Sequence, residues 1–352
     1  MVTVLEEIRL QSRFCGEFGS HFTEQLLSRV ADDIEAGGIC ETLTASWPGH
    51  PRADAVSLRL AGALHAAALT SRDPKLAAEY PGERKHWSMD RVWPIARDFL
   101  QREETYVRDF MKSPPQTNET ARSTGLACGF LWLAERSPEP FHMLELGASA
   151  GLNLNWDRFA YDHPAWGRGG LSGPHMPTRI DGPAPRWRDI EIASRAACDQ
   201  NPLDVSAAED RLRLRAYIWA DQAARMERLN AAIDLARSLG IKPDRADAAE
   251  WAKAKLAGQL PPGTTVIYHS VFYQYPPREV RQAIRDAIEE GGSRTTADRR
   301  LAWVRFEPNA VIGGPIEPVR YVLNVVTWNA GKRSEETLAD VDPHGRFVTW
   351  IS

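Results

Sequence analysis

The sequence lacks any pair of cysteines close enough in the chain to suggest a metal site or a disulfide framework. Its four cysteines lie far apart, and no C-x-x-C pair occurs among Cys15, Cys40, Cys128 and Cys198. The spacing of the histidines does not suggest a zinc site either. We therefore expect buried, unreactive thiols and a protein that works in a reducing compartment.

Long apolar runs are also absent. No stretch reaches the roughly 20 apolar residues that a membrane-spanning helix needs. The first residues carry Glu6, Glu7, Arg9 and Arg13 among their apolar positions, so they do not resemble the apolar core of a signal peptide. These absences predict a cytoplasmic protein.

An excess of positive charge is missing as well. The 352 residues include 43 Lys and Arg against 47 Asp and Glu, which gives a formal net charge of −4. A chain so nearly balanced has no strong field that would gather nucleic acid. We therefore expect no nucleic-acid partner, and the lack of long apolar runs predicts no membrane partner.

Two different patterns divide the chain. Over residues 1–136 apolar residues recur at spacings of three and four, which predicts a helical N-terminal region on the lid or substrate side of the protein. Within it we expect helices at 57–70 and 92–111. A further helix should begin after Asn118, a favourable N-cap residue.

The remaining residues, 137–352, alternate between strand and helix patterns, which predicts an α/β fold with a mostly parallel sheet covered on both faces. A Gly- and Pro-rich stretch at about 160–189 interrupts the pattern as an irregular insertion. The last two strands have no helix between them, which predicts an antiparallel terminal hairpin. We expect strands at 141–146, 190–198, 265–270, 301–306, 321–328 and 346–351, and helices at 211–239 and 278–289.

The most informative segment reads LELGASAGLNLNWDRF, from Leu144 to Phe159. A strand that ends in small residues and turns into a helix lets the backbone come close to a ligand. The start of the helix then presents free backbone N–H groups to that ligand. Glu145 precedes the first glycine, where a carboxylate can hold a cationic amine. We therefore expect a cofactor at this loop.

Other kinds of site fit the loop less well. The dinucleotide fingerprint G-x-G-x-x-G requires glycine where Ser149 and Leu152 stand, and the Gly-Lys-Ser/Thr of a P-loop is absent. The residues from Gly147 to Gly151 do match the G-x-S-x-G nucleophile elbow, with His269 or His344 as the base. Because the upstream residues look helical and contain no oxyanion loop, a serine hydrolase using Ser149 is the lesser alternative. A purely structural turn is another.

Four motifs resemble those of one bacterial family, the uncharacterised domain of unknown function 2332. Besides the loop segment, the chain contains PQTNE at 115–119, CDQNPLDV at 198–205 and VIYHSVFYQYPP at 266–277. The motifs stand in the same order as in the family, and the resemblance covers nearly the whole chain. It implies a methyltransferase-like α/β fold behind a helical N-terminal region, but it implies no activity.

The chain is also similar to the Rossmann-like S-adenosylmethionine-dependent methyltransferases. In that superfamily an acidic-x-Gly-x-Gly-x-Gly loop closes the first strand. Here Glu145, Gly147, Ser149 and Gly151 take those positions, so that serine replaces the middle glycine. The resemblance implies S-adenosylmethionine as the cofactor, and we include Asn153 among the residues that would bind it.

Two aspartates resemble further cofactor ligands of that superfamily. Asp199 follows the second expected strand, where a carboxylate accepts hydrogen bonds from both ribose hydroxyls. The beginning of a turn is the alternative explanation for Asp199. Asp247 resembles the acidic residue on the adenine side, and helix capping explains it equally well.

The loop after the fourth expected strand would face the transferred methyl group. His269 is the candidate base because its ordinary pKa lies near neutrality, and Tyr275 would orient the acceptor. A hydrogen-bonded structural histidine at the end of a strand is the alternative.

A polar cluster before the helix near Asn118 is a candidate lid. We expect Gln116, Asn118 and Arg122 to contact cofactor or acceptor, and we count Glu119 among the catalytic candidates. Capping explains Asn118 and Glu119 as well. The sequence thus favours a methyltransferase with an unknown small-molecule or protein acceptor. Because Ser149 and the insertion depart from the superfamily pattern, a binding or regulatory protein without turnover is the alternative.

Overall fold

The computed structural model describes residues 3–82, 86–164, 166, 173–183, 185–240 and 242–351. The chain forms two compact units, one of residues 1–117 with 206–227 and one of residues 118–205 with 228–352. Our predicted boundary at residue 136 lies inside the second unit, because the helix that precedes it packs on the sheet of that unit.

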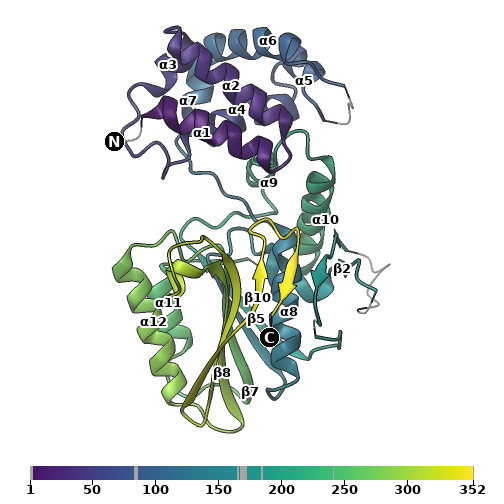
Figure 1. The fold of residues 1–352 in the computed structure, drawn as a ribbon, viewed down its shortest axis with the longest axis vertical. Helices are drawn as coiled ribbons and strands as arrows, with labels where there is room; N and C mark the ends of the chain where they lie inside the picture. The colour runs from purple at the N-terminus through teal and green to yellow at the C-terminus, as the bar shows by residue number, and fades with distance from the viewer. Residues whose placement is uncertain are drawn as a thin grey trace. The chain divides into compact units, whose positions relative to one another are not determined.

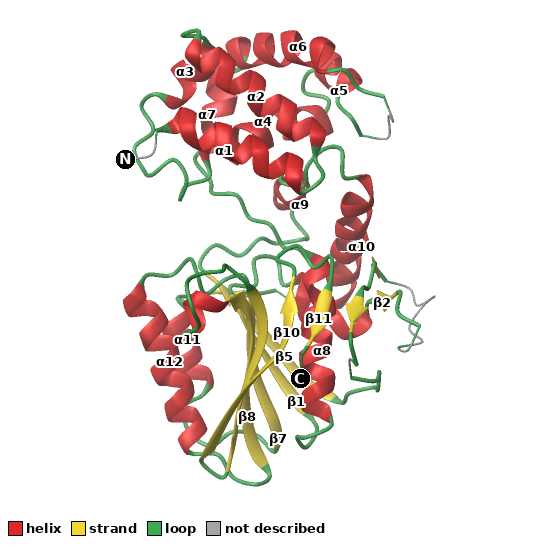
Figure 2. Ribbon diagram, viewed as in Figure 1, coloured by secondary structure: helices red, strands yellow, loops and turns green. Residues whose placement is uncertain are grey.

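The first unit is helical (Figures 1 and 2). The helix predicted at 57–70 is confirmed, and most of its side chains are buried. The helix predicted at 92–111 is two helices, because the chain leaves helical geometry at Glu103, where φ is −113° and ψ is 29°. The described helices of the first unit are α1 (Val4–Glu17), α2 (His21–Glu35), α3 (Ile39–Thr44), α4 (Val56–Leu69), α5 (Pro74–Glu79), α6 (Met89–Arg102), α7 (Glu104–Met111) and α9 (Ala208–Ala216).

Residues 206–227 belong to this helical unit although they come from the middle of the chain. Asp221 accepts hydrogen bonds from Ser20 Oγ at 2.5 Å and from Phe22 N at 2.9 Å. Burial lowers the pKa of His65 to about 4, and its neutral ring contacts Ala216 O at 3.2 Å. The single helical segment that we predicted at 211–239 is two helices, α9 and α10 (Ala223–Leu239), which residues 217–222 separate.

The second unit is built on a nine-stranded sheet within the described residues, in the order β4-β11-β10-β9-β8-β7-β1-β5-β6. Strands β6, β5, β1, β7 and β8 run parallel, whereas β9, β10 and β11 each pair antiparallel with the strand before them. The α/β class and the mostly parallel sheet with antiparallel C-terminal strands are confirmed. The strands are β1 (Phe141–Leu146), β4 (Ile180–Asp181), β5 (Ile192–Asp199), β6 (Asp244–Arg245), β7 (Gly263–Ser270), β8 (Arg299–Pro308), β9 (Tyr321–Asn329), β10 (Lys332–Val341) and β11 (Val348–Trp350).

Helices cover both faces of this sheet (Figure 1). Helix α8 (Ser123–Ala134) packs on one face, where Gly125 and Gly129 allow a close approach to β8. A Cβ atom at Gly125 would lie 2.9 Å from the Phe306 ring, and one at Gly129 would lie 3.0 Å from Val304. Helices α11 (Ala248–Lys255) and α12 (Arg278–Ser293) bury the apolar side chains of the other face.

The predicted terminal hairpin is wrong in one respect. We expected the strand at 321–328 to pair with the one at 346–351, but β10 lies between them and pairs with both. Residues 332–337 of β10 are exposed, and all of them are charged or polar. This part of the strand therefore lacks the alternation of apolar and polar residues by which a half-buried strand is recognised. The hydrophobic pattern therefore did not reveal it.

The insertion predicted at 160–189 contains only short strands among its described residues. Strands β2 (Ala160–Tyr161) and β3 (His175–Met176) form a small sheet of their own, and β4 joins the edge of the main sheet. Residues 165, 167–172 and 184 of this stretch lie outside the described residues. Within the described ranges no helix is long and apolar enough to cross a membrane.

The four cysteines are buried and form no disulfide, as expected. Burial raises the pKa of the Cys15 and Cys198 thiols to about 12, and it raises the pKa of Cys40 and Cys128 further. Thiols with such pKa values stay protonated near neutral pH, so they are poor nucleophiles.

Candidate functional site

The strand order defines where a ligand site is expected in this sheet. From β1 the chain continues to β5 and β6 on one side, and then to β7 and β8 on the other. In open α/β sheets a crevice forms where the order reverses, outside the carboxyl ends of the two strands concerned. We call this place, with residues 147–151 after β1 and 271–273 after β7, the switch-point site.

The loop after β1 turns by means of left-handed backbone conformations. Gly147, Ser149 and Gly151 have φ values of 64°, 53° and 71°. A residue with a Cβ atom pays about 1–2 kcal/mol for this conformation, so glycine suits the first and third positions. Ser149 stands where the methyltransferase pattern has glycine, and its backbone conformation is one that glycine adopts more easily.

The predicted helix after this loop is absent. Residues Leu152–Arg158 form a 3-10 helix, η2, with a non-helical residue at Asn155. The chain leaves helical geometry at Asn155, where φ is −111° and ψ is 21°. The prediction of an α-helix whose first turn offers free amides to a ligand is therefore wrong.

Four backbone N–H groups in residues 148–152 donate to partners within the protein. Ser149 N donates to Asp199 Oδ2 at 2.8 Å, and Leu152 N donates to Asn118 Oδ1 at 2.9 Å. Ala148 N and Gly151 N donate to backbone carbonyls. In this conformation the loop is braced by its neighbours.

The two aspartates predicted to bind cofactor both make backbone contacts. Asp199 Oδ1 accepts from Asn201 N at 2.8 Å, while its Oδ2 accepts from Ser149 N, so Asp199 holds the loop against β5. Each carboxylate oxygen can accept one more hydrogen bond. Asp247 caps α11 by accepting from Ala249 N and Glu250 N, as the capping alternative proposed.

Glu145 is buried beneath the loop, with 3% of its surface exposed. Burial raises the pKa of its carboxyl group to about 8, although the Tyr268 hydroxyl lies 3.4 Å away and opposes the rise. Glu145 therefore carries its proton at neutral pH in this structure. To hold a cationic amine it would have to release that proton.

This pKa shift predicts a pH dependence of stability. Because the pKa of Glu145 is about 8 in the folded chain and 4.5 ordinarily, its contribution is fully present below about pH 4.5 and is lost as the pH rises to about 8. Glu145→Gln should remove this loss. Urea unfolding between about pH 5 and 9 should show a smaller decline in the free energy of unfolding for the variant, and equal declines would contradict the assignment.

His269 is placed where it cannot act as the expected base. It is fully buried, and its Nδ1 lies 2.7 Å from Glu307 Oε1. The Trp303 indole donates to its Nε2 at 3.0 Å, so Nδ1 carries the proton and donates to Glu307. With both nitrogens engaged, the ring has no free position at which to take a proton from a substrate. The structural alternative describes His269 in this conformation.

The residues after His269 reach toward the loop that follows β1. Phe272 lies against Gly147, since a Cβ atom built on Gly147 would come within 2.0 Å of the Phe272 ring. Val271 has a φ of 53°, which is rare for a β-branched residue. Tyr275 is 74% exposed and could meet a substrate from solvent.

The expected lid residues belong to different units. Gln116 is in the first unit, whereas Asn118, Glu119 and Arg122 are in the second. Asn118 does not cap a helix, because its side chain holds Leu152 N, and Glu119 instead accepts from Ala121 N.

Two other contacts tie this segment to the switch-point site. Asn153 Nδ2 donates to Glu119 O at 3.1 Å. Arg122 donates to Ser270 O at 3.2 Å and to Pro343 O at 2.7 Å, which links the segment to the end of β7. Asn118, Glu119, Arg122 and Asn153 therefore lie around the loop.

The serine hydrolase alternative gains no support from Ser149. Its Oγ is buried and makes no hydrogen bond within the described residues. A nucleophilic serine needs a base within hydrogen-bond reach, and His269 is engaged by Glu307 and Trp303.

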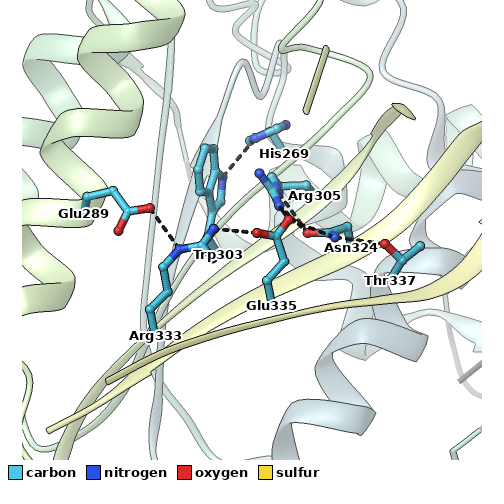
Figure 3. Close-up of polar contacts among 8 residues, drawn as sticks. All are labelled: His269, Glu289, Trp303, Arg305, Asn324, Arg333, Glu335 and Thr337. Carbon is cyan, nitrogen blue, oxygen red and sulfur yellow. Dashed lines mark hydrogen bonds and ion pairs between the residues drawn. The ribbon is translucent and has the colours of Figure 1, made fainter. Parts of the chain in front are cut away.

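A polar network around the buried Arg305, on the α12 face of the sheet, was missed by the sequence patterns (Figure 3). Arg305 is 1% exposed, donates to Asn324 Oδ1 and pairs with Glu335. Arg333 joins Glu335 to Glu289 on α12, at 3.1 Å from Glu289. The signal available was the presence of Arg and Glu at alternate positions of the apolar segment LAWVRFEP at 301–308.

Nearly the whole chain matches a known family. The family model, described as "Uncharacterized protein conserved in bacteria (DUF2332)", matches residues 5–350. The chain matches no curated protein and no solved structure. Because the family match spans all but the first four and last two residues, the chain belongs to the DUF2332 family.

Proposed function

We propose that the chain is an S-adenosylmethionine-dependent methyltransferase that binds its cofactor at the switch-point site and acts on a small-molecule or protein acceptor. One observation carries the proposal. The left-handed loop from Gly147 to Gly151 follows the central strand β1 where the strand order reverses, and Asp199 ends the adjacent strand β5 beside it. This arrangement matches the cofactor loop and ribose-binding carboxylate implied by the superfamily resemblance.

The chain's own groups suit such a cofactor in part. Asp199 braces the loop and keeps acceptor capacity for ribose hydroxyls. Glu145 would accept from an amine once it has lost its proton. Phe272 occupies the space beside Gly147, so its ring must move or form one wall of the site. The cofactor, when bound, supplies an electrophilic methyl group.

The protein's task in such a transfer is mainly to position the acceptor. His269 holds the loop after β7 and takes no proton in this proposal. Tyr275, exposed on that loop, is the candidate to orient the acceptor, and Glu119 remains a catalytic candidate beside the loop.

Thermal unfolding with S-adenosylmethionine or S-adenosylhomocysteine tests the proposal. A ligand at a hundred times its Kd stabilises by ~2.7 kcal/mol, which we expect to raise the Tm by several degrees. NAD should give no rise. Asp199→Asn should reduce the shift in Tm. The control Asp298→Asn should keep it, because Asp298 directly precedes β8 and so lies at the amino ends of the parallel strands, away from the site.

A rise that is equal in both variants would place the ligand elsewhere. No rise at millimolar ligand would contradict the proposal. It would favour the second candidate, a binding or regulatory protein that does not use this cofactor. The internal pairing of the loop amides and the packing of Phe272 on Gly147 are the observations that favour this second candidate.

A further inference from the structure

We infer that Glu307 is a positioning residue of the switch-point site. Its carboxylate holds the turn after β7 so that Phe272 lies on Gly147, and Phe272 thereby controls access to the loop after β1. The role of Glu307 in holding the turn stands on the contacts alone. The control of access rests on the proposed function, since it requires a ligand at that loop.

The contacts of Glu307 converge on one oxygen. Glu307 is the second-last residue of β8 and is fully buried. Its Oε1 accepts from Phe272 N at 2.7 Å, from Tyr273 N at 3.0 Å and from His269 Nδ1 at 2.7 Å. Because a buried N–H group that loses its acceptor is costly in free energy, these three bonds fix the turn.

The turn itself needs such support. Val271 adopts a φ of 53°, which costs free energy in a β-branched residue. The backbone N–H of Val271 itself donates to Phe306 O at 2.8 Å, which ties this residue to β8. Without the acceptor at Glu307, the turn would lose the two hydrogen bonds from Phe272 N and Tyr273 N that follow the strained residue.

A fixed histidine completes the support. Trp303 on β8 donates to His269 on β7, as Figure 3 shows, and the His269 ring stacks on Tyr273 with centroids 5.1 Å apart. Trp303 is 1% exposed, so this chain of contacts lies in the core. The carboxylate therefore cannot swing away from the turn without disturbing two strands.

The consequence falls on Phe272. Atoms Cδ2 and Cγ of its ring lie 2.0 Å and 2.4 Å from the position of a Cβ on Gly147, so the ring rests directly on the glycine. A ligand that approaches the backbone of Gly147 must displace the ring. Because Glu307 fixes the backbone of Phe272, only the side chain is left to move.

Two substitutions at position 307 separate the acceptor from the residue's bulk. Glu307→Leu removes the acceptor. Glu307→Gln keeps one oxygen, and its amide nitrogen takes the place of Oε2, which makes no hydrogen bond within the described residues. In hydrogen exchange, the amides of Phe272 and Tyr273 should exchange at least roughly tenfold faster in Glu307→Leu. They should stay close to the wild-type rate in Glu307→Gln. Unchanged exchange in the leucine variant would overturn the assignment.

Binding of S-adenosylhomocysteine tests the second step. Phe272→Ala should lower the Kd by roughly tenfold, because a site blocked in most molecules binds with a correspondingly weakened apparent affinity. Glu307→Leu should also lower the Kd. The double variant Phe272→Ala with Glu307→Leu should bind no tighter than Phe272→Ala alone. Additive effects, or weaker binding by Phe272→Ala, would contradict control of access by Phe272.

The outcomes also separate this inference from the proposed function. If neither the wild type nor Phe272→Ala binds the ligand, the proposed function fails and so does the control of access. The exchange of the two amides still decides the role of Glu307. If Glu307→Leu does not fold, Glu307→Asp provides the same test, because its shorter side chain draws the acceptor away from the amides of Phe272 and Tyr273. Full protection of both amides in that variant would count against the assignment.

Discussion

Replacing Glu335 with alanine should lower the free energy of unfolding by about 3 kcal/mol, because it leaves a charge buried without its ionic partner. Arg305 is 1% exposed, and its guanidinium contacts Asn324 Oδ1 and Glu335 Oε1. Burial lowers the pKa of Arg305, but an arginine does not give up its proton in a protein. We place the loss at the low end of the range for buried pairs because Glu335 is 34% exposed, so that water can replace part of the carboxylate.

Urea unfolding measures this loss, and three other variants define its cause. Ser334→Ala, next to Glu335 on the exposed part of β10, should change the free energy of unfolding by less than about 0.5 kcal/mol. Arg333→Ala should cost less than Glu335→Ala, because its partners Glu335 and Glu289 are 34% and 38% exposed, whereas Glu335 pairs with the buried Arg305. Replacing the pair together, as Arg305→Met with Glu335→Leu, should restore much of the loss. A double variant as unstable as the sum of its parts would argue against an unpaired charge.

The strands that could be predicted from the sequence are those whose side chains are buried along nearly the whole strand. The segments that became β1, β7 and β8 are apolar runs, and their side chains are buried on both faces of the sheet. Strand β10 was missed for the opposite reason, since residues 332–337 face solvent. Hydrophobic pattern reports burial, so it finds a strand only where the strand is covered.

The turn after β1 was predictable from the sequence, but its contacts were not. Glycines at 147 and 151 showed where the chain turns after β1, and both have left-handed backbone conformations. The partner of Asn118 could not be predicted, because a capping residue and a side chain that binds Leu152 N look alike in sequence. His269 was assigned as a base on its ordinary pKa, but its role depends on Glu307 and Trp303 in the neighbouring strand.

The site's own side chains account for much of what a ligand would otherwise contact. Asp199 and Asn118 accept from the loop amides, and Phe272 covers Gly147. A ligand that binds here must exchange some of these internal contacts for its own, so its apparent affinity is reduced by the cost of opening the site. The same contacts hold the loop in one conformation, which reduces the ordering that binding requires.

Gly147→Ala should combine two costs and lower the free energy of unfolding by about 2–4 kcal/mol. The left-handed conformation, with φ at 64°, costs about 1 kcal/mol for a residue with a Cβ atom, and forcing that atom against a packed ring adds about 1–3 kcal/mol. Gly258→Ala is the matched control. Gly258 has a φ of 73° and no heavy atom within 4 Å of its would-be Cβ, so it should show the backbone cost alone.

A double variant separates the two costs at Gly147. If the second cost comes from the Phe272 ring, Gly147→Ala should destabilise a Phe272→Ala background by no more than Gly258→Ala destabilises the wild type, as measured by urea unfolding. The penalty would then fall to about 1 kcal/mol. A penalty that stays the same with and without the ring would mean that Phe272 does not rest on Gly147 in solution. The space beside the glycine would then be open to a ligand without any movement of that side chain.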